Sequence, residues 1–62
     1  MRYGILNTDT LGADRFISAS SELEAMQMFC KDEGVDDRRI KMEGSWYSIT
    51  IDGVLYQCIP VR

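Results

Sequence analysis

One segment of this 62-residue chain carries both helix start and helix stop signals, and this limits how many layers the chain can build. Ser21 and Glu24 open it with a Ser-x-x-Glu capping box, in which serine and carboxylate each accept from the other's backbone N–H. Gly34 suits the left-handed position that ends a helix. At helical spacing, one apolar stripe forms between these signals, made of Leu23, Met26, Phe29 and Cys30. A single helix over residues 21–33 can cover one face of a sheet.

Three strand-like segments follow the helix. "RIKM", "SWYSITI" and "VLYQCIPV" are separated by Glu43-Gly44 and Asp52-Gly53, and each pair of residues is suited to a two-residue hairpin loop with positive φ angles. The pattern predicts a three-stranded antiparallel meander.

The Asp52-Gly53 turn fixes which side chains of the second hairpin share a face. It pairs Trp46 with Ile59, and the first hairpin places Lys41 opposite Trp46. The predicted helix-facing set is Tyr47, Ile49, Ile51, Val54, Tyr56 and Cys58, with Ile40 and Met42. The opposite face is predicted to carry Trp46, Ser48, Thr50, Leu55, Gln57, Ile59, Val61 and Lys41.

Two further strand-like segments, "RYGILN" and "RFISA", precede the helix and predict a first hairpin. Ile17 and Ala19 are expected to face the helix, and Phe16 the other side. The predicted order is therefore β-β-α-β-β-β, an α+β fold in which one helix packs on an antiparallel sheet, with residues 1–62 as one domain.

The face that the helix does not cover is the strongest functional signal. It is expected to carry Phe16, Trp46, Leu55, Ile59 and Val61, although a wet sheet face normally carries polar residues. Large exposed apolar patches mark interfaces, and aromatic residues are favoured there. We predict that these five residues bind a partner protein or a second copy of the chain. The alternative is that the chain's own loop and termini close the patch.

The outer helix surface and the following turn give a second candidate surface. Met28 is an isolated apolar residue on the outer helical face, and methionine adapts well to a partner. Asp36 and Asp37 belong to an acidic cluster with Asp32 and Glu33, which are unfavourable at a helix C-terminus. Met28, Asp36 and Asp37 are therefore added to the predicted partner-binding residues.

Enzymatic chemistry is not expected. The chain has no histidine, and Cys30 and Cys58 do not have a metal-ligand spacing, so we predict no catalytic residues, no metal and no cofactor. The two cysteines are expected to be reduced, buried thiols of a cytoplasmic protein. The chain has no apolar run long enough to span a membrane, and it suggests no small-molecule substrate.

Charge argues against nucleic acid as the main partner. Seven Lys and Arg stand against ten Asp and Glu, a formal charge of −3. Sequence-independent binding of a phosphate backbone would need the basic residues to gather on one surface. Weak nucleic-acid binding by an accessory protein stays open as an alternative function.

The segments "FISASSELEAMQMF" and "IKMEGSWYSITIDGVLYQC" resemble many small phage and mobile-element proteins. The layout is similar to that of certain small anti-CRISPR inhibitors built from a sheet and one helix, although this chain is acidic. The resemblance implies a phage-encoded inhibitor of a host defence or regulatory complex, acting in the cytoplasm of a bacterial host. No functional residue is carried over from it. The expected function is thus non-enzymatic protein binding by surface occlusion, with a structural homodimer as the alternative.

Overall fold

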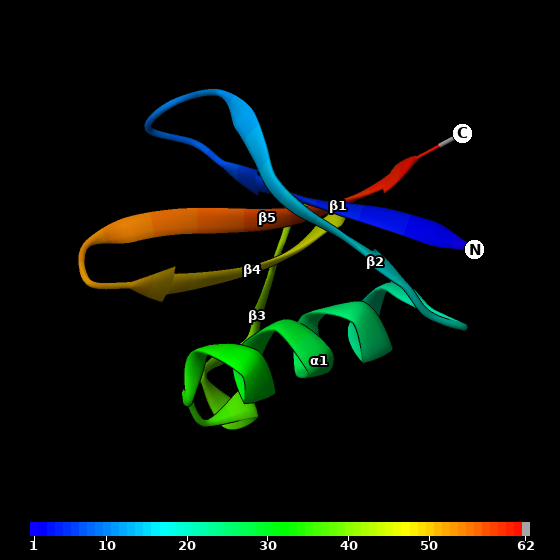
Figure 1. Cartoon of the computed structure of the whole chain (residues 1–62). Coiled ribbons are helices and arrows are strands. Elements are labelled where there is room, and N and C mark those ends of the chain that lie inside the picture. The colour runs from blue at the N-terminus through cyan, green and yellow to red at the C-terminus, as the bar shows by residue number, and fades with distance from the viewer. Residues whose placement is uncertain (62) are drawn as a thin grey trace.

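The computed structural model describes residues 1–61 and forms a five-stranded antiparallel sheet with one α-helix on one face (Figure 1). A 3-10 turn, η1, follows the helix. The elements are β1 (Arg2–Asn7), β2 (Gly12–Ser18), α1 (Glu22–Glu33), η1 (Asp37–Arg39), β3 (Lys41–Glu43), β4 (Trp46–Ile51) and β5 (Val54–Val61). The predicted α+β fold class and the order of helix and strands are confirmed.

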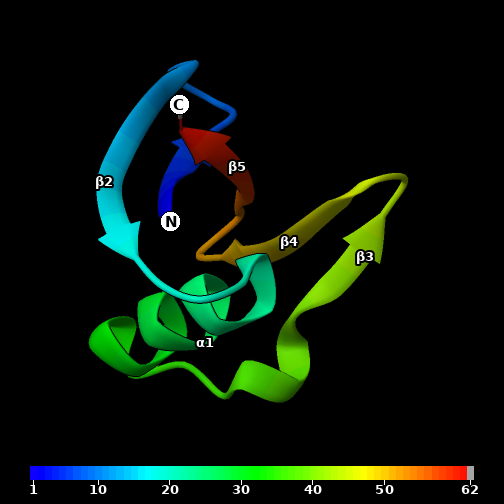
Figure 2. The same ribbon diagram turned by 90° about the vertical axis from the view of Figure 1, so that its right-hand side faces the viewer.

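The sheet order is β2-β1-β5-β4-β3, so the first and last strands pair at its centre. Gly4 faces Ile59 and Ile5 faces Cys58 across this central pair. The edge strands β2 and β3 lie on either side of α1 (Figure 2). The sheet therefore holds the helix between its edges on one face and leaves the other face without a second layer.

The ends of α1 follow the expected capping chemistry with one correction. The Ser21 hydroxyl oxygen accepts from the Glu24 N–H at 3.1 Å, as predicted. The Glu24 carboxylate, however, accepts from the backbone N–H and the hydroxyl of Ser20, at 3.0 and 2.9 Å, and not from Ser21. Gly34 ends the helix at φ 68°, and the Val35 N–H donates to the Cys30 carbonyl oxygen at 2.9 Å.

The core lies between α1 and the sheet. The phenyl ring of Phe29 is fully buried, with its centroid 5.2 Å from that of Tyr56. Leu23 was predicted on the buried stripe but is 38% exposed, whereas Ala25 is fully buried. The buried apolar residues are Tyr3, Ile5, Ile17, Ala19, Ala25, Met26, Phe29, Cys30, Ile49 and Cys58.

The β4–β5 hairpin has the predicted turn and the predicted register beside it. Asp52 and Gly53 have φ angles of 51° and 79°, which a two-residue hairpin loop requires. Pairing runs from Ile51 with Val54 to Ser48 with Gln57.

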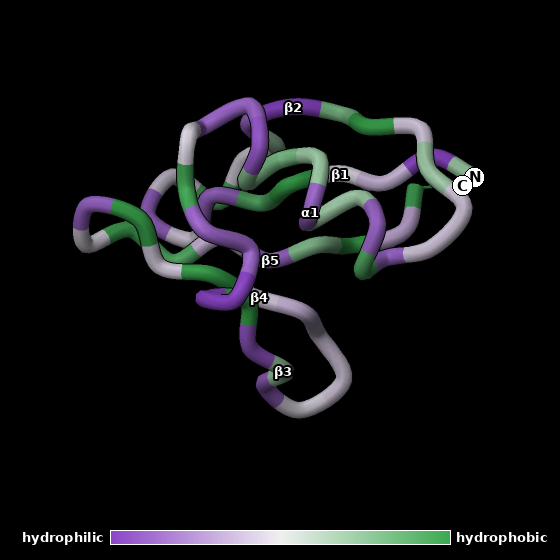
Figure 3. Tube along the Cα trace, turned by 90° about the horizontal axis from the view of Figure 1, so that it is seen from below, coloured by the Kyte–Doolittle hydropathy of each residue, from purple (hydrophilic) through white to green (hydrophobic). Residues whose placement is uncertain are grey.

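For the residues of β4 that precede Ser48, the predicted pairing with β5 was wrong. The β4–β5 pairing ends at Ser48 and Gln57, so Trp46 does not pair with Ile59, and its partner in β3 is Glu43. The loop end of the β3–β4 hairpin projects from the rest of the sheet (Figure 3). Trp46 is thereby carried away from β5.

The register of the β3–β4 hairpin differs from the prediction by two residues. Its loop is Gly44-Ser45, and Lys41 faces Ser48 rather than Trp46. A shift of two residues leaves every side chain on its original face, because side chains alternate with a period of two. The predicted faces of Lys41 and Trp46 therefore stand although their pairing does not.

Candidate protein-binding surfaces

The sheet face opposite α1 carries a small apolar patch built over a glycine. Phe16 of β2, Gly4 of β1 and Ile59 of β5 face one another in a row across the three strands. A Cβ atom at Gly4 would lie 3.4 Å from Val61 Cγ2, 3.5 Å from Phe16 Cε1 and 3.6 Å from Ile59 Cγ1. The side chains of Phe16, Ile59 and Val61 thus converge over Gly4, and we call these three residues the sheet-back patch.

Exposure is unequal within the sheet-back patch. Phe16 is 51% exposed, whereas Ile59 and Val61 are half-buried against their neighbours. The Arg2 guanidinium carbon lies 4.6 Å from the centroid of the Phe16 ring, a cation–π contact. The patch therefore presents one aromatic ring with a cation at its rim.

The remaining two residues predicted for this face lie outside the sheet-back patch. Leu55 is half-buried near the start of β5, and the polar Gln57 lies between it and Ile59 along that face. Trp46 is 41% exposed on the projecting β3–β4 hairpin. The structure thus divides the predicted surface into a compact patch and two separate apolar side chains.

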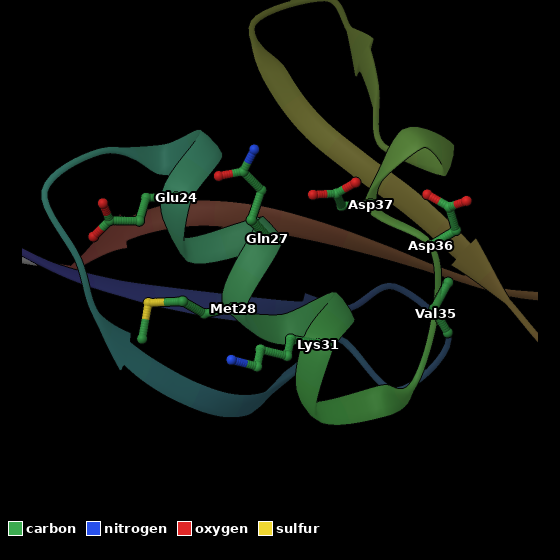
Figure 4. A pocket seen from close by; sticks show the side chains of 7 residues that line it. All are labelled: Glu24, Gln27, Met28, Lys31, Val35, Asp36 and Asp37. Carbon is green, nitrogen blue, oxygen red and sulfur yellow. The ribbon is translucent and has the colours of Figure 1, made fainter.

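The structure brings the second set of predicted residues together. Met28, Asp36 and Asp37 line one groove of about 560 Å³ on the outer surface of α1 (Figure 4). Glu24, Gln27, Met28 and Lys31 line its helical side because they recur at intervals of three and four residues. We call this hollow the α1 groove; its full lining is Glu24, Gln27, Met28, Lys31, Val35, Asp36 and Asp37.

Two carboxylates of the α1 groove are held as anions by hydrogen bonds. Asp36 accepts from the Arg38 side chain, with a shortest N–O distance of 2.7 Å, and from the Arg38 backbone N–H, and these bonds lower the pKa of Asp36. The pKa of Glu24 is lowered by its hydrogen bonds from Ser20. For Asp37 and Lys31, no side-chain ion pair or hydrogen bond is recorded with any other residue in 1–61. Those two side chains are therefore available to a partner.

Two of the four residues in the predicted acidic cluster pair with an arginine, and the sequence analysis did not predict this contact. Arg15 of β2 forms ion pairs with Glu33 at 2.9 Å and with Asp32 at 3.7 Å, and its guanidinium lies 4.9 Å from the Phe29 ring centroid. It thus offsets the unfavourable carboxylates at the C-terminal end of α1. Asp36 and Asp37 remain on the side of the α1 groove.

A second hollow, of about 280 Å³, lies beside β3 and β4. Arg39, Lys41 and Glu43 line it together with Ser48 and Thr50, and the Arg39 guanidinium donates to the Thr50 carbonyl oxygen. Strand β3 pairs with β4 only as far as Ser48, so the Arg39 bond gives the Thr50 carbonyl a donor that β3 does not supply. Arg39 therefore has a structural role at this edge.

The cysteines are buried in the core. Burial raises the pKa of the Cys58 thiol to about 11, with a smaller effect of Glu22, and burial also raises the pKa of Cys30. Within residues 1–61, no three His, Cys, Asp or Glu side chains are placed to hold a metal ion. In the same part of the chain, no helix has the length and apolar character needed to cross a membrane.

Neither a scan of protein-family models nor searches of curated proteins and of solved structures find a match to this chain.

Proposed function

We propose that this chain is a non-enzymatic protein-binding module that occludes a partner's surface through the sheet-back patch. The observation that carries the proposal is the convergence of Phe16, Ile59 and Val61 over Gly4 on the face without a helix. The residue at the centre of that row is a buried glycine, so the three larger side chains close over it and form one continuous apolar surface.

The chemistry of the patch favours a protein partner. Aromatic side chains and arginine are enriched in protein interfaces, and a few such residues usually dominate the affinity. The half-exposed Phe16 ring with Arg2 beside it fits that pattern. Two other arginines, Arg15 and Arg38, are engaged by carboxylates, which disfavours nucleic acid. The sequence resemblance to small anti-CRISPR inhibitors supports a host defence or regulatory complex as the partner, in the cytoplasm of a bacterial host.

The test is affinity capture from bacterial lysate with three versions of the chain. A protein recovered by the wild type is purified and titrated against Phe16→Ser and against Leu11→Asn. Leu11 is a matched control because it is 80% exposed, lies in the β1–β2 turn and has a φ of 59°, which asparagine tolerates. We expect Phe16→Ser to weaken binding about tenfold or more, as loss of an interface anchor does, and Leu11→Asn to leave it unchanged.

Two outcomes would contradict the proposal. Equal affinity of wild type and Phe16→Ser for the recovered protein, with both variants folded by circular dichroism, removes the patch as the interface. Sedimentation of the purified chain gives the second: a tight dimer that Phe16→Ser dissociates would show that the patch binds a second copy instead.

A further inference from the structure

The α1 groove lies on the helix side of the molecule, away from the sheet-back patch, and its chemistry differs. We propose that it is a second docking site, and that it binds a basic segment of a protein partner. In this complex an apolar side chain of the segment rests on Met28. Lysine or arginine side chains on either side of it pair with the carboxylates at the two ends of the groove.

The floor of the groove supplies the apolar contact. Met28 is 42% exposed on the outer surface of α1, and Val35 is half-buried just after the Gly34 helix stop. A methionine side chain is unbranched and flexible, so it can fit a partner surface at little cost. A single apolar side chain of the partner would cover Met28.

The ends of the groove supply complementary charge. Glu24 lies at one end, and Asp36 and Asp37 lie at the other (Figure 4). Asp36 already holds the exposed Arg38 guanidinium through both carboxylate oxygens, whereas Asp37 has no recorded side-chain partner within residues 1–61. With Asp36 paired to Arg38, two further carboxylates, Glu24 and Asp37, face one lining cation, Lys31, so the lining favours a cationic ligand.

The helical side of the groove sets a minimum length for the ligand. The helical run from Glu24 to Lys31 rises about 10 Å, and Asp37 lies beyond it. In an extended segment, residues two apart share a face, and four residues span about 13 Å. A Lys-x-Leu-x-Lys segment therefore places one apolar side chain over Met28 and a cation toward each acidic end.

The probe is a capped peptide with the core Lys-Ser-Leu-Ser-Lys, added to the ¹⁵N-labelled chain and followed by the shifts of its backbone amides. Two matched peptides, with Glu in place of both Lys or with Ser in place of Leu, serve as controls. We expect the first peptide to shift amides within residues 24–37. We expect the Glu peptide to give no such shifts, the Leu-free peptide to bind more weakly, and raised salt to weaken binding.

Two variants give the proposal an electrostatic sign test. Asp37→Asn should weaken binding of the lysine peptide about two- to fivefold, and Lys31→Gln should strengthen it by a similar factor, as expected for exposed charges. Both side chains are on the surface, so the fold should persist. Equal shifts with the Glu peptide, no shifts with millimolar lysine peptide, or weaker binding by Lys31→Gln would each overturn the proposal.

The groove and the sheet-back patch can fail separately. Phe16→Ser should leave the peptide titration unchanged, because Phe16 is on the opposite face of the sheet. If Phe16→Ser loses binding of the partner protein and the wild-type chain binds no peptide, only the proposal for the α1 groove is removed. If the peptide binds but Phe16→Ser does not weaken binding of the partner protein, the proposal for the sheet-back patch is removed instead.

Discussion

The two faces of the sheet are formed by the same strands but lie in different environments. On the helix side, Ile5, Ile49 and Cys58 have 2% or less of their surface exposed, because α1 covers them. On the other side, Phe16 remains 51% exposed. A chain of this size buries only roughly 60% of its unfolded surface, and one helix is enough for one face. The uncovered face is the one proposed to bind, and the covered face must supply the stability.

Two phenylalanines provide the sharpest test of that difference. Phe29→Ala removes a fully buried ring from the covered face and should cost about 3–5 kcal/mol, enough to unfold a marginally stable small domain. Phe16→Ala removes a half-exposed ring and should cost about 1 kcal/mol, since burial of a whole side chain contributes 1.5–3 kcal/mol. Urea unfolding followed by circular dichroism measures both losses.

The ratio of the two losses is the informative quantity. If Phe16→Ala destabilises the chain as much as Phe29→Ala, the sheet-back patch is a second core and not a binding surface. A similar denaturant dependence in wild type and Phe16→Ala would confirm that the variant unfolds from the same compact state.

How far the sequence predicted the fold depended on how local the determining signal was. The β4–β5 register near the turn was correct because Asp52 and Gly53 both take positive φ angles. In the β3–β4 hairpin, one glycine, Gly44, could serve either of two loops, and the structure uses Gly44-Ser45. The pairing of β1 with β5 joins the two ends of the chain, and no local pattern reports such a contact.

The candidate sites show the same limit. Met28, Asp36 and Asp37 were each identified from local features, but their shared groove depends on how the chain turns after Gly34. Arg15 was not predicted to meet Glu33, because strand β2 and the end of α1 are brought together by tertiary packing. The convergence over Gly4 likewise required the β1–β5 pairing. Residue types and, apart from cases such as Leu23, faces were therefore predictable, whereas long-range neighbours were not.

Alkaline pH should affect the covered face through Cys58. The ordinary thiol pKa is 9.0 and burial raises the pKa of Cys58 to about 11, so between these values the unfolded chain releases a proton that the folded chain retains. The stabilisation is complete below about pH 9 and is lost as the pH rises through about 11.

Thermal melts across that alkaline range measure the effect. We expect the Tm of the wild type to fall more steeply with pH than the Tm of Cys58→Ala, which lacks the titrating group. The two proteins differ only at this side chain, so the difference between their slopes isolates Cys58. Parallel slopes would mean that the thiol is less shielded than its burial by α1 implies.

The smallest expected effect concerns Gly4, which lies at the centre of the uncovered face. Its φ angle is not among the positive ones, and an added Cβ would make ordinary van der Waals contacts with Phe16, Ile59 and Val61. Glycine within a strand costs about 0.5–1 kcal/mol relative to alanine, so Gly4→Ala should raise the free energy of unfolding by up to that amount. A loss of stability instead would show that the three side chains are packed as tightly as a core. In that case the two faces of the sheet would differ in what covers them but not in how they are packed, and Phe16 alone would remain as the binding element.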